Sequence, residues 1–286
     1  MKNGQRITVF MLTLLLSCGL SAQDNSSPQD WQIPAQKENF HIFLLMGQSN
    51  MAGFGEMLPE DTQPVPRVLK LPTIGEVQWE PAAHPLHNRQ KSDRFGLGLP
   101  FAEEYLKDKP GVVVGLIPVA QGGAAIDKMN KGTPIYADAI KKAEFAATQG
   151  VIKGVLWHQG ESDTTSAPRT DIYEQKLHQL IADLRQDLKD DNLPFIAGNL
   201  AEFYGTGPEH NKPDRVARID MVRATLRALP DKVKNTGFAE STGCSSADAH
   251  MVHFDRNSYI ILGKRYAEVY SRIINKELKT PGQLAP

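Results

Sequence analysis

The feature that most constrains the fold is an apolar run, Ile42–Met46, which ends abruptly in the polar segment Gly47-Gln48-Ser49-Asn50. A short continuous apolar run is typical of a parallel strand that is buried on both faces. Gly47 allows a tight turn there, and Ser49 is then presented at the carboxyl edge of the sheet, where open α/β folds bind ligands and place nucleophiles. Ser49 is therefore a candidate nucleophile, although a serine that only caps a helix gives the same local pattern.

Four further segments have the same strand-like character, the last more weakly: 112–119, 151–157, 195–200 and 236–239. Helical periodicity occurs at 99–107, 135–149, 173–188, 219–229 and 259–274. Because strands alternate with helices and the strands are continuously apolar, we predict an α/β fold whose parallel sheet is covered on both faces. Residues 54–98 contain many Pro and Gly residues without a clear period, and we expect a long loop insertion near the site.

Composition excludes several classes of protein. The chain has 286 residues, of which 41% are hydrophobic, enough for one large domain with its own core. The formal net charge is −1 and no basic stripe is present, so we expect no nucleic-acid partner. The two cysteines are Cys18 and Cys244, and we interpret Cys244 as a small packed side chain without a disulfide partner in the mature chain.

The N-terminus has the pattern of a targeting segment. Positive charge precedes an apolar stretch, Ile7–Leu16, that is too short to span a bilayer, and small residues follow. We predict a signal peptide over 1–22, cut after Ala22, a linker over 23–38, and an enzymatic domain over 39–278 of a secreted or periplasmic protein without a membrane span. The segment that ends at Cys18 is also similar to a bacterial lipoprotein cleavage box, in which case Cys18 would carry a lipid anchor.

Two more segments with reactive side chains follow predicted strands. Gly122-Gly123 can turn backbone N–H groups toward an anion, although an isolated glycine pair is more often a flexible turn. The segment Trp157–Asp163 places a ring, an amide and two acids directly after a strand. Within it, Gln159 can donate its amide to an oxyanion, and Glu161 can serve as a buried, oriented acid.

A fourth segment, 248–255, precedes the last helix and contains His250 and His253. His253 stands between Val252 and Phe254, and we expect these apolar neighbours to hold its ring in place. Two histidines at this spacing could ligate a metal, but the sequence offers no clear third ligand. We therefore predict no metal site.

In this order, the four segments resemble the SGNH-type hydrolases and, within them, the sialate O-acetylesterase-like domain shared with carbohydrate esterase family six, which includes acetylxylan esterases. The resemblance covers roughly residues 40–272. It implies a flavodoxin-like, three-layer α/β/α sandwich with five parallel strands and no cofactor. It also implies Ser49 as nucleophile, His253 as general base, and an oxyanion hole formed by the backbone N–H groups of Ser49 and of Gly122 or Gly123, with the Gln159 side chain contributing.

The sequence departs from the family pattern at one position. In this family an Asp usually stands three residues before the catalytic histidine, and here that position is His250, which cannot provide a negative charge. Our first candidate for the missing acid is Glu161, since the equivalent Glu has this role in parts of the family. Asp248 is the second candidate, and a Ser-His dyad without an acid is the third.

The resemblance implies an exported esterase that removes O-acetyl groups from an oligo- or polysaccharide. We expect the long loop to form a sugar-facing wall from Trp79, His84, His87 and Arg89. Two alternatives remain open: an esterase that acts on non-sugar acyl esters, and a weakly active carbohydrate-binding relative that has lost its triad Asp.

Overall fold

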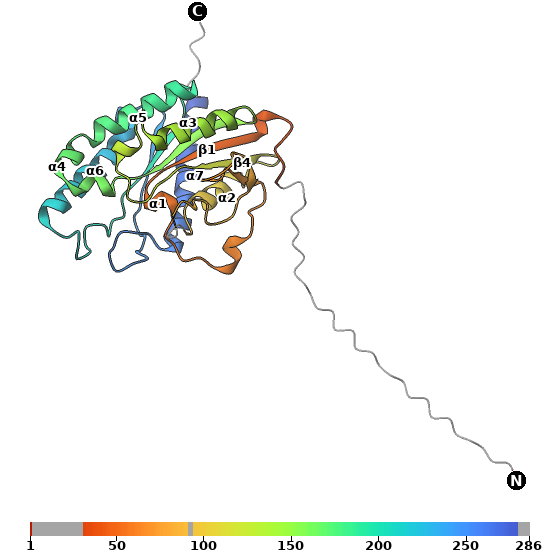
Figure 1. The fold of residues 1–286 in the computed structure, drawn as a ribbon, viewed down its shortest axis with the longest axis horizontal. Coiled ribbons are helices and arrows are strands. Elements are labelled where there is room, and N and C mark those ends of the chain that lie inside the picture. The colour runs from red at the N-terminus through yellow and green to blue at the C-terminus, as the bar shows by residue number, and fades with distance from the viewer. Residues whose placement is uncertain (2–30, 91–93, 280–286) are drawn as a thin grey trace, which may run out of the picture.

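The computed structural model describes Met1, residues 31–90 and residues 94–279 (Figure 1). In this part of the chain one seven-stranded sheet has the order β3-β2-β4-β1-β5-β6-β7. Its strands are β1 (Phe40–Gly47), β2 (Val68–Lys70), β3 (Glu80–Pro81), β4 (Val113–Pro118), β5 (Val151–His158), β6 (Phe195–Gly198) and β7 (Thr236–Ala239). All neighbouring pairs are parallel except β2 and β3.

All five strands that the sequence predicts are present, but the count of five is wrong. Both additional strands, β2 and β3, come from the region 54–98, which we expected to be a loop. They have three residues and two residues, respectively, and are therefore too short for a period to be recognised. The chain thus extends the parallel sheet by one strand and closes its edge with a short antiparallel one.

The five predicted helical segments are also present. They correspond to α2 (Gly98–Leu106), α3 (Pro134–Ala147), α5 (Tyr173–Leu188), α6 (Pro213–Lys232) and α7 (Arg256–Lys279). Two short helices, α1 (Ser49–Ala52) and α4 (Ala167–Asp171), were not predicted. Local signals set some ends: Thr133 caps α3 by accepting a bond from Tyr136 N, with Pro134 in the first turn, and α5 ends at Lys189 in the left-handed conformation.

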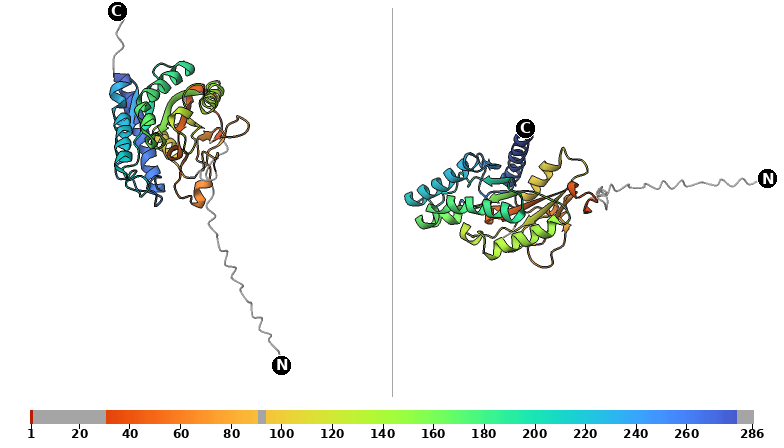
Figure 2. Two further views of the ribbon diagram at one scale, coloured as in Figure 1. Left: turned by 60° about the vertical axis from the view of Figure 1, so that its left-hand side comes forward. Right: turned by 90° about the horizontal axis from the view of Figure 1, so that it is seen from above.

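The helices form two layers around the sheet, as predicted. In Figure 2 (right), α2 and α7 lie on one side of the sheet and α3 lies on the other. α2 packs against α7, whereas α3 packs against β1, β4 and β5 and also against α5. The largest fully buried side chains, among them Trp157, Tyr173, Tyr259 and Phe43, fill the space between the layers.

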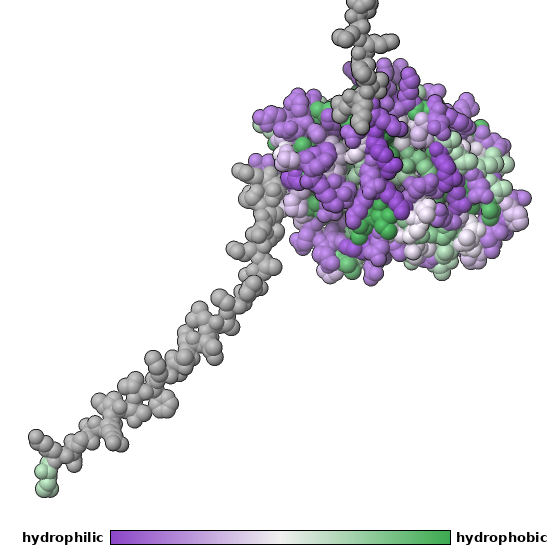
Figure 3. All heavy atoms as spheres, turned by 180° about the vertical axis from the view of Figure 1, so that it is seen from behind, coloured by the Kyte–Doolittle hydropathy of each residue, from purple (hydrophilic) through white to green (hydrophobic). Residues whose placement is uncertain are grey.

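In the view of Figure 3, hydrophilic residues predominate on the left and centre of the surface, and hydrophobic residues are more frequent on the right. None of the helices in the described residues is long and apolar enough to cross a membrane. Cys244 is half-buried and forms no disulfide with another described residue. The predicted signal peptide and Cys18 lie outside the described residues. Within the predicted linker, the Trp31 side chain donates a hydrogen bond to Val65 O at 3.0 Å.

The order of the strands places the candidate nucleophile at a topological switch. The five strands predicted from the sequence have the order β4-β1-β5-β6-β7, which is that of flavodoxin-like folds, in which ligands bind outside the carboxyl ends of the strands where the chain reverses its direction of growth. That point is the end of β1, directly before Ser49. Gly47 is required there, because a Cβ on it would lie 2.1 Å from the carbonyl oxygen of His158 and its φ is +145°.

Candidate active site

Ser49, His253 and Asp248 form a continuous chain of hydrogen bonds. The Ser49 Oγ lies 3.1 Å from His253 Nε2, within the hydrogen-bond reach that the hydrolase interpretation requires. The other ring nitrogen, His253 Nδ1, lies 2.8 Å from Asp248 Oδ2. With Nδ1–H donating to Asp248, Nε2 is free to accept the Ser49 hydroxyl proton, which is the arrangement of a serine hydrolase triad.

The loop that carries the histidine explains how an acid five residues upstream can reach it. Ala247 N donates to His253 O at 2.8 Å, and Ser246 and Phe254 form an antiparallel bridge, so that the base of the loop is closed. Met251 has φ +57°, which lets the chain reverse within the loop. Asp248 stands two residues further upstream of His253 than the position that the resemblance implies, and the reversal at Met251 returns it to face His253.

His250, which occupies the usual position of the acid, lies elsewhere. Its side chain is exposed, and its Nδ1 is 3.2 Å from Glu209 Oε1. His250 and His253 therefore have different partners. The described residues contain no group of three or more histidine, cysteine or acidic side chains that could hold a metal ion.

Phe54 holds the ring of His253 from one side. The two rings are stacked, with centroids 3.9 Å apart and planes 12° from parallel. Burial lowers the pKa of His253 below its usual value, while the hydrogen bond with Asp248 acts in the opposite direction. Burial also raises the pKa of Asp248, but contact with His253 outweighs it and leaves that pKa below its usual value. The pair is thus a neutral base beside an ionised acid at neutral pH.

Glu161, our first candidate for the acid, forms no hydrogen bond with His253. Its Oε1 accepts a hydrogen bond of 2.6 Å from Asn50 Nδ2, and its Oε2 has no partner among the described residues. The side chain is 3% exposed, and burial raises the pKa of Glu161, opposed by the Asn50 hydrogen bond. The structure therefore contradicts the expectation that Glu161 orients His253: an acid that has no contact with the imidazole cannot fix its tautomer.

Asn50 connects the two loops, a function that the sequence did not predict. Besides Glu161, its Nδ2 donates to Val252 O at 3.1 Å, and its Oδ1 accepts bonds from Phe254 N at 3.3 Å and from the Tyr259 hydroxyl at 2.9 Å. Asn50 is fully buried. Both backbone bonds flank His253, so Asn50 fixes the base relative to the adjacent Ser49. The position of Asn50 directly after Ser49 in the first motif was the only signal.

The predicted oxyanion donors meet at the carboxyl edge of the sheet. Ser49 begins α1, so its backbone N–H has no acceptor within the helix. Gln121 N donates to Gly47 O at 3.0 Å, which places the turn containing Gly122 and Gly123 next to the end of β1. Within the described chain, the N–H groups of Gly122 and Gly123 donate to no other backbone group. None of these three N–H groups thus has a backbone acceptor among the described residues.

Gln159 is not available in this way. Its Nε2 donates to Asp163 Oδ2 at 2.5 Å and lies 3.2 Å from Gln48 Oε1, and the side chain has no exposed surface. The expected donation from Gln159 to an oxyanion is therefore not supported. Gln159 instead braces the turn after β5 against the turn after β1. Burial, only partly offset by this hydrogen bond, raises the pKa of Asp163 to about 6.

The expected sugar-facing wall is also wrong in three of its four residues. Trp79 packs against Phe40, the first residue of β1, at the end of the sheet remote from Ser49. His84 and His87 are 6% and 1% exposed and belong to the interior. Arg89 pairs with Asp138 at 3.3 Å. Because residues 54–98 show no hydrophobic periodicity, the sequence did not indicate which of these side chains would be buried.

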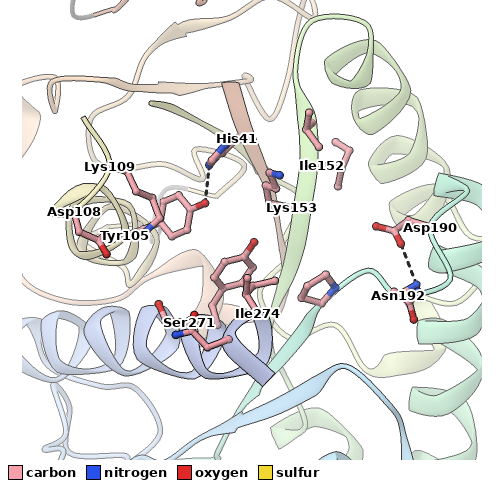
Figure 4. A pocket seen from close by; sticks show the side chains of 14 residues that line it. His41, Tyr105, Asp108, Lys109, Ile152, Lys153, Asp190, Asn192, Ser271 and Ile274 are labelled. Atoms are coloured by element: carbon pink, nitrogen blue, oxygen red, sulfur yellow. Dashed lines mark hydrogen bonds and ion pairs between the residues drawn. The ribbon is translucent and has the colours of Figure 1, made fainter. Parts of the chain in front are cut away.

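A large hollow lies far from this chemistry. Its volume is about 660 Å³, and it is lined by residues such as His41, Tyr105 and Lys153 (Figure 4). His41 and Lys153 lie at the amino ends of β1 and β5, whereas Ser49 follows the carboxyl end of β1. The hollow is therefore at the opposite edge of the sheet from the triad.

The family follows from comparison with known proteins. A family model described as carbohydrate esterase, sialic acid-specific acetylesterase, matches residues 39–272. The chain belongs to this family.

Relatives of known structure share the fold. A probable carbohydrate esterase from Arabidopsis thaliana is 30% identical over 249 residues, which are 80% of this chain and 89% of the relative. The solved structure of this same Arabidopsis protein is 31% identical to the chain, with a TM-score of 0.71 over 82% of this chain and 98% of that chain. NanS is 18% identical, with a TM-score of 0.68 over 84% and 99% of the two chains. A carbohydrate acetylesterase from Xanthomonas citri is 21% identical, with a TM-score of 0.58 over 82% and 56%.

Proposed function

We propose that this carbohydrate esterase is an exported serine O-acetylesterase that hydrolyses acetyl esters on glycans. The observation that carries the proposal is the hydrogen-bonded chain from Ser49 through His253 to Asp248. The family membership and the carbohydrate esterases among the relatives support the choice of a sugar ester as substrate.

In the first half of the reaction, Ser49 Oγ attacks the acetyl carbon while its proton passes to His253 Nε2. The charge that develops on the carbonyl oxygen is stabilised by the N–H groups of Ser49 and of Gly122 or Gly123, each worth about 3 kcal/mol in comparable oxyanion holes. Asp248 stabilises the imidazolium. Collapse of the tetrahedral intermediate breaks the ester bond, and the sugar oxygen leaves with the proton from His253.

In the second half, water attacks the acetyl-Ser49 ester. His253 takes a proton from that water and returns it to Ser49 Oγ as acetate leaves. Each step uses the same base and the same donors, so no cofactor is needed. Asp248 contacts His253 as a triad acid does, which favours an active enzyme over a binding protein that has lost its triad.

Acetate release from a panel of acetylated glycans tests this function. The intact enzyme should release acetate, and Ser49→Ala should abolish release while thermal melting stays unchanged. Simple aryl or alkyl acetates belong in the same panel. Acetate release from these simple esters alone, with no sugar ester cleaved, would favour the non-sugar esterase. If no ester is cleaved in a way that depends on Ser49, the proposal is overturned.

The proposed export rests on the N-terminal sequence. We expect the mature protein to begin at Gln23, and N-terminal sequencing of the exported form tests this. If the exported protein incorporates a labelled lipid and the Cys18→Ser variant does not, the lipoprotein alternative replaces cleavage after Ala22. If the protein stays inside the cell and retains residues 1–22, both the signal-peptide and the lipoprotein alternatives are wrong.

A further inference from the structure

The turn that follows β4 is bonded by three side chains that follow β5. This turn contains Gly122 and Gly123, whose N–H groups the proposed reaction uses. The three hydrogen bonds run from Ser162 Oγ to Gly123 O at 3.0 Å, from Gln159 Nε2 to Ala124 O at 3.3 Å, and from Ile126 N to Asp163 Oδ2 at 2.9 Å. We refer to the side chains of Gln159, Ser162 and Asp163 as the clamp.

The clamp is itself fixed by hydrogen bonds, and two of its three residues, Gln159 and Asp163, are buried. Asp163 Oδ2 accepts the bond from Gln159 Nε2 as well as the one from the turn, so a single carboxylate oxygen joins two members of the clamp to the turn. Gln48 Oε1 lies 3.2 Å from Gln159 Nε2 and 3.2 Å from Ser162 N. Gln48 directly precedes Ser49 in the sequence. The clamp therefore connects the turn of the two glycines to the turn of the nucleophile.

Two adjacent glycines need such external support if their N–H groups are to keep one direction. Glycine has no Cβ and adopts many backbone conformations, and Gly123 has φ +73° here. The turn is tied at its start by Gln121 N, which donates to Gly47 O at 3.0 Å, and beyond its start by the clamp. Gly122 and Gly123 lie between these two attachments. Donors that are already fixed stabilise a developing oxyanion without reorganisation during the reaction.

We propose that Ser162 and Asp163 are positioning residues of the esterase, which hold the N–H groups of Gly122 and Gly123 in the direction that an oxyanion needs. This inference rests on the proposed function and deepens it. In the described chain, neither Ser162 nor Asp163 forms a hydrogen bond with a residue of the triad. Their effect on turnover must therefore pass through the turn of the two glycines.

Removal of the clamp bonds should lower kcat and leave KM nearly unchanged, because both halves of the reaction pass through an oxyanion. We expect Asp163→Ala to lower kcat on phenyl acetate about a hundredfold, the effect of a displacement of roughly 1 Å. Ser162→Ala removes one bond to the turn and should cost about tenfold by the same reasoning. Asp163→Asn keeps an acceptor oxygen for Ile126 N and Gln159 Nε2, so it should recover most of the loss.

A transition-state analogue separates a positioning function from a purely structural one. Phenyl trifluoromethyl ketone adds to Ser49: an Oγ–C bond forms, the carbonyl π pair becomes the negative charge on oxygen, and the serine proton passes to His253 Nε2. The Ki of this ketone should rise in each variant by the factor by which kcat/KM falls. The Ki of acetanilide, an unreactive amide, should stay the same. The acid limb of the pH profile of kcat/KM should not move, because the clamp forms no bond with His253.

The matched control is Ser166→Ala, three residues beyond Asp163, whose side chain forms no cap hydrogen bond with α4. It should keep both kcat and the Ki of the ketone. Thermal melting reports folding, and Ser162→Ala decides alone if Asp163→Ala does not fold. Three results would overturn the clamp while leaving the esterase intact: normal kcat in every folded alanine variant of the clamp, a loss of kcat/KM with an unchanged Ki of the ketone, or no recovery in Asp163→Asn. If the intact enzyme cleaves no ester in a Ser49-dependent way, the failure is that of the proposed function.

Discussion

The loops 158–163 and 245–255 both carry a carboxylate near Ser49, yet only one of these carboxylates contacts the histidine. Glu161 in the first loop is almost fully buried, its pKa is raised by burial, and its partner is the neutral amide of Asn50. Asp248 in the second loop is half-exposed, its pKa is lowered by contact with His253, and it binds the ring directly. A triad acid must be both charged and in contact. Glu161 stands in a distinctive motif directly after a buried strand, but the burial of its carboxyl there disfavours the charged form that a triad acid needs.

Removing the charge of Asp248 is the strongest test of this contrast. Asp248→Asn keeps the shape but holds His253 in the wrong tautomer, and the corresponding change in a serine protease costs roughly ten-thousand-fold in turnover. We expect a loss approaching that size with an unchanged melting temperature, measured as kcat on one acetyl ester.

His250→Asp is a useful companion to that variant. It restores the acid at the family position, but His250 lies beside Glu209 and away from the triad, so we expect no gain in turnover. A rise in kcat for this variant in the Asp248→Asn background would show that the loop can rearrange to use either position.

The pH dependence of folding stability should be set mainly by titratable side chains in the interior rather than by those of the triad. Burial lowers the pKa of His84, His87 and His158 to about 3 each. Their neutral forms stabilise the fold fully above the unfolded value of about 6.5, and this stability is lost as the pH falls toward 3. Asp163, with its pKa raised to about 6, acts in the opposite direction, since its contribution is present at low pH and lost as the pH rises through 6.

From these four groups, unfolding between pH 4 and 6 should therefore take up about two protons net, a slope of about 2.7 kcal/mol per pH unit. Urea unfolding at several pH values measures this slope. His87→Leu should reduce it by about one proton, whereas Asp248→Asn should alter it much less in this window. Stability that is flat from pH 4 to 6 would show that burial does not lower the pKa of these three histidines so far.

Asn50→Ala should damage both loops at once. It leaves the buried Glu161 carboxyl, the Tyr259 hydroxyl and Phe254 N without their partner. Each unsatisfied buried group costs about 1–3 kcal/mol, so the melting temperature should fall clearly and kcat should fall as His253 loses its fixed position. Asn275→Ala, at an exposed asparagine of α7, is the control. Normal kcat in a stable Asn50→Ala would show that Asn50 has no positioning function.

The sequence predicted the elements better than the partners of individual side chains. The strand before Ser49 and the helices were predicted because their periodicity extends over many residues. Ser49 and His253 were recognised from motifs, and their mutual distance agrees with the fold. Asp248 was ranked second, because a loop closed by Ala247 N and His253 O cannot be inferred from spacing alone. Phe54 was missed because its stacking on His253 joins residues 199 positions apart, with no local pattern.

Glu161→Gln should have the smallest effect. The variant keeps the shape and removes a carboxyl that is costly to ionise in the interior, so stability at neutral pH should be equal or slightly higher. Turnover should stay close to that of the intact enzyme, because Glu161 reaches His253 only through Asn50. The measurement is kcat beside the melting temperature, with Asp248→Asn in the same assay. A collapse of turnover in Glu161→Gln with a near-normal Asp248→Asn would reverse the assignment of the acid. A collapse in both would mean that Asn50 transmits the charge of Glu161 to the base.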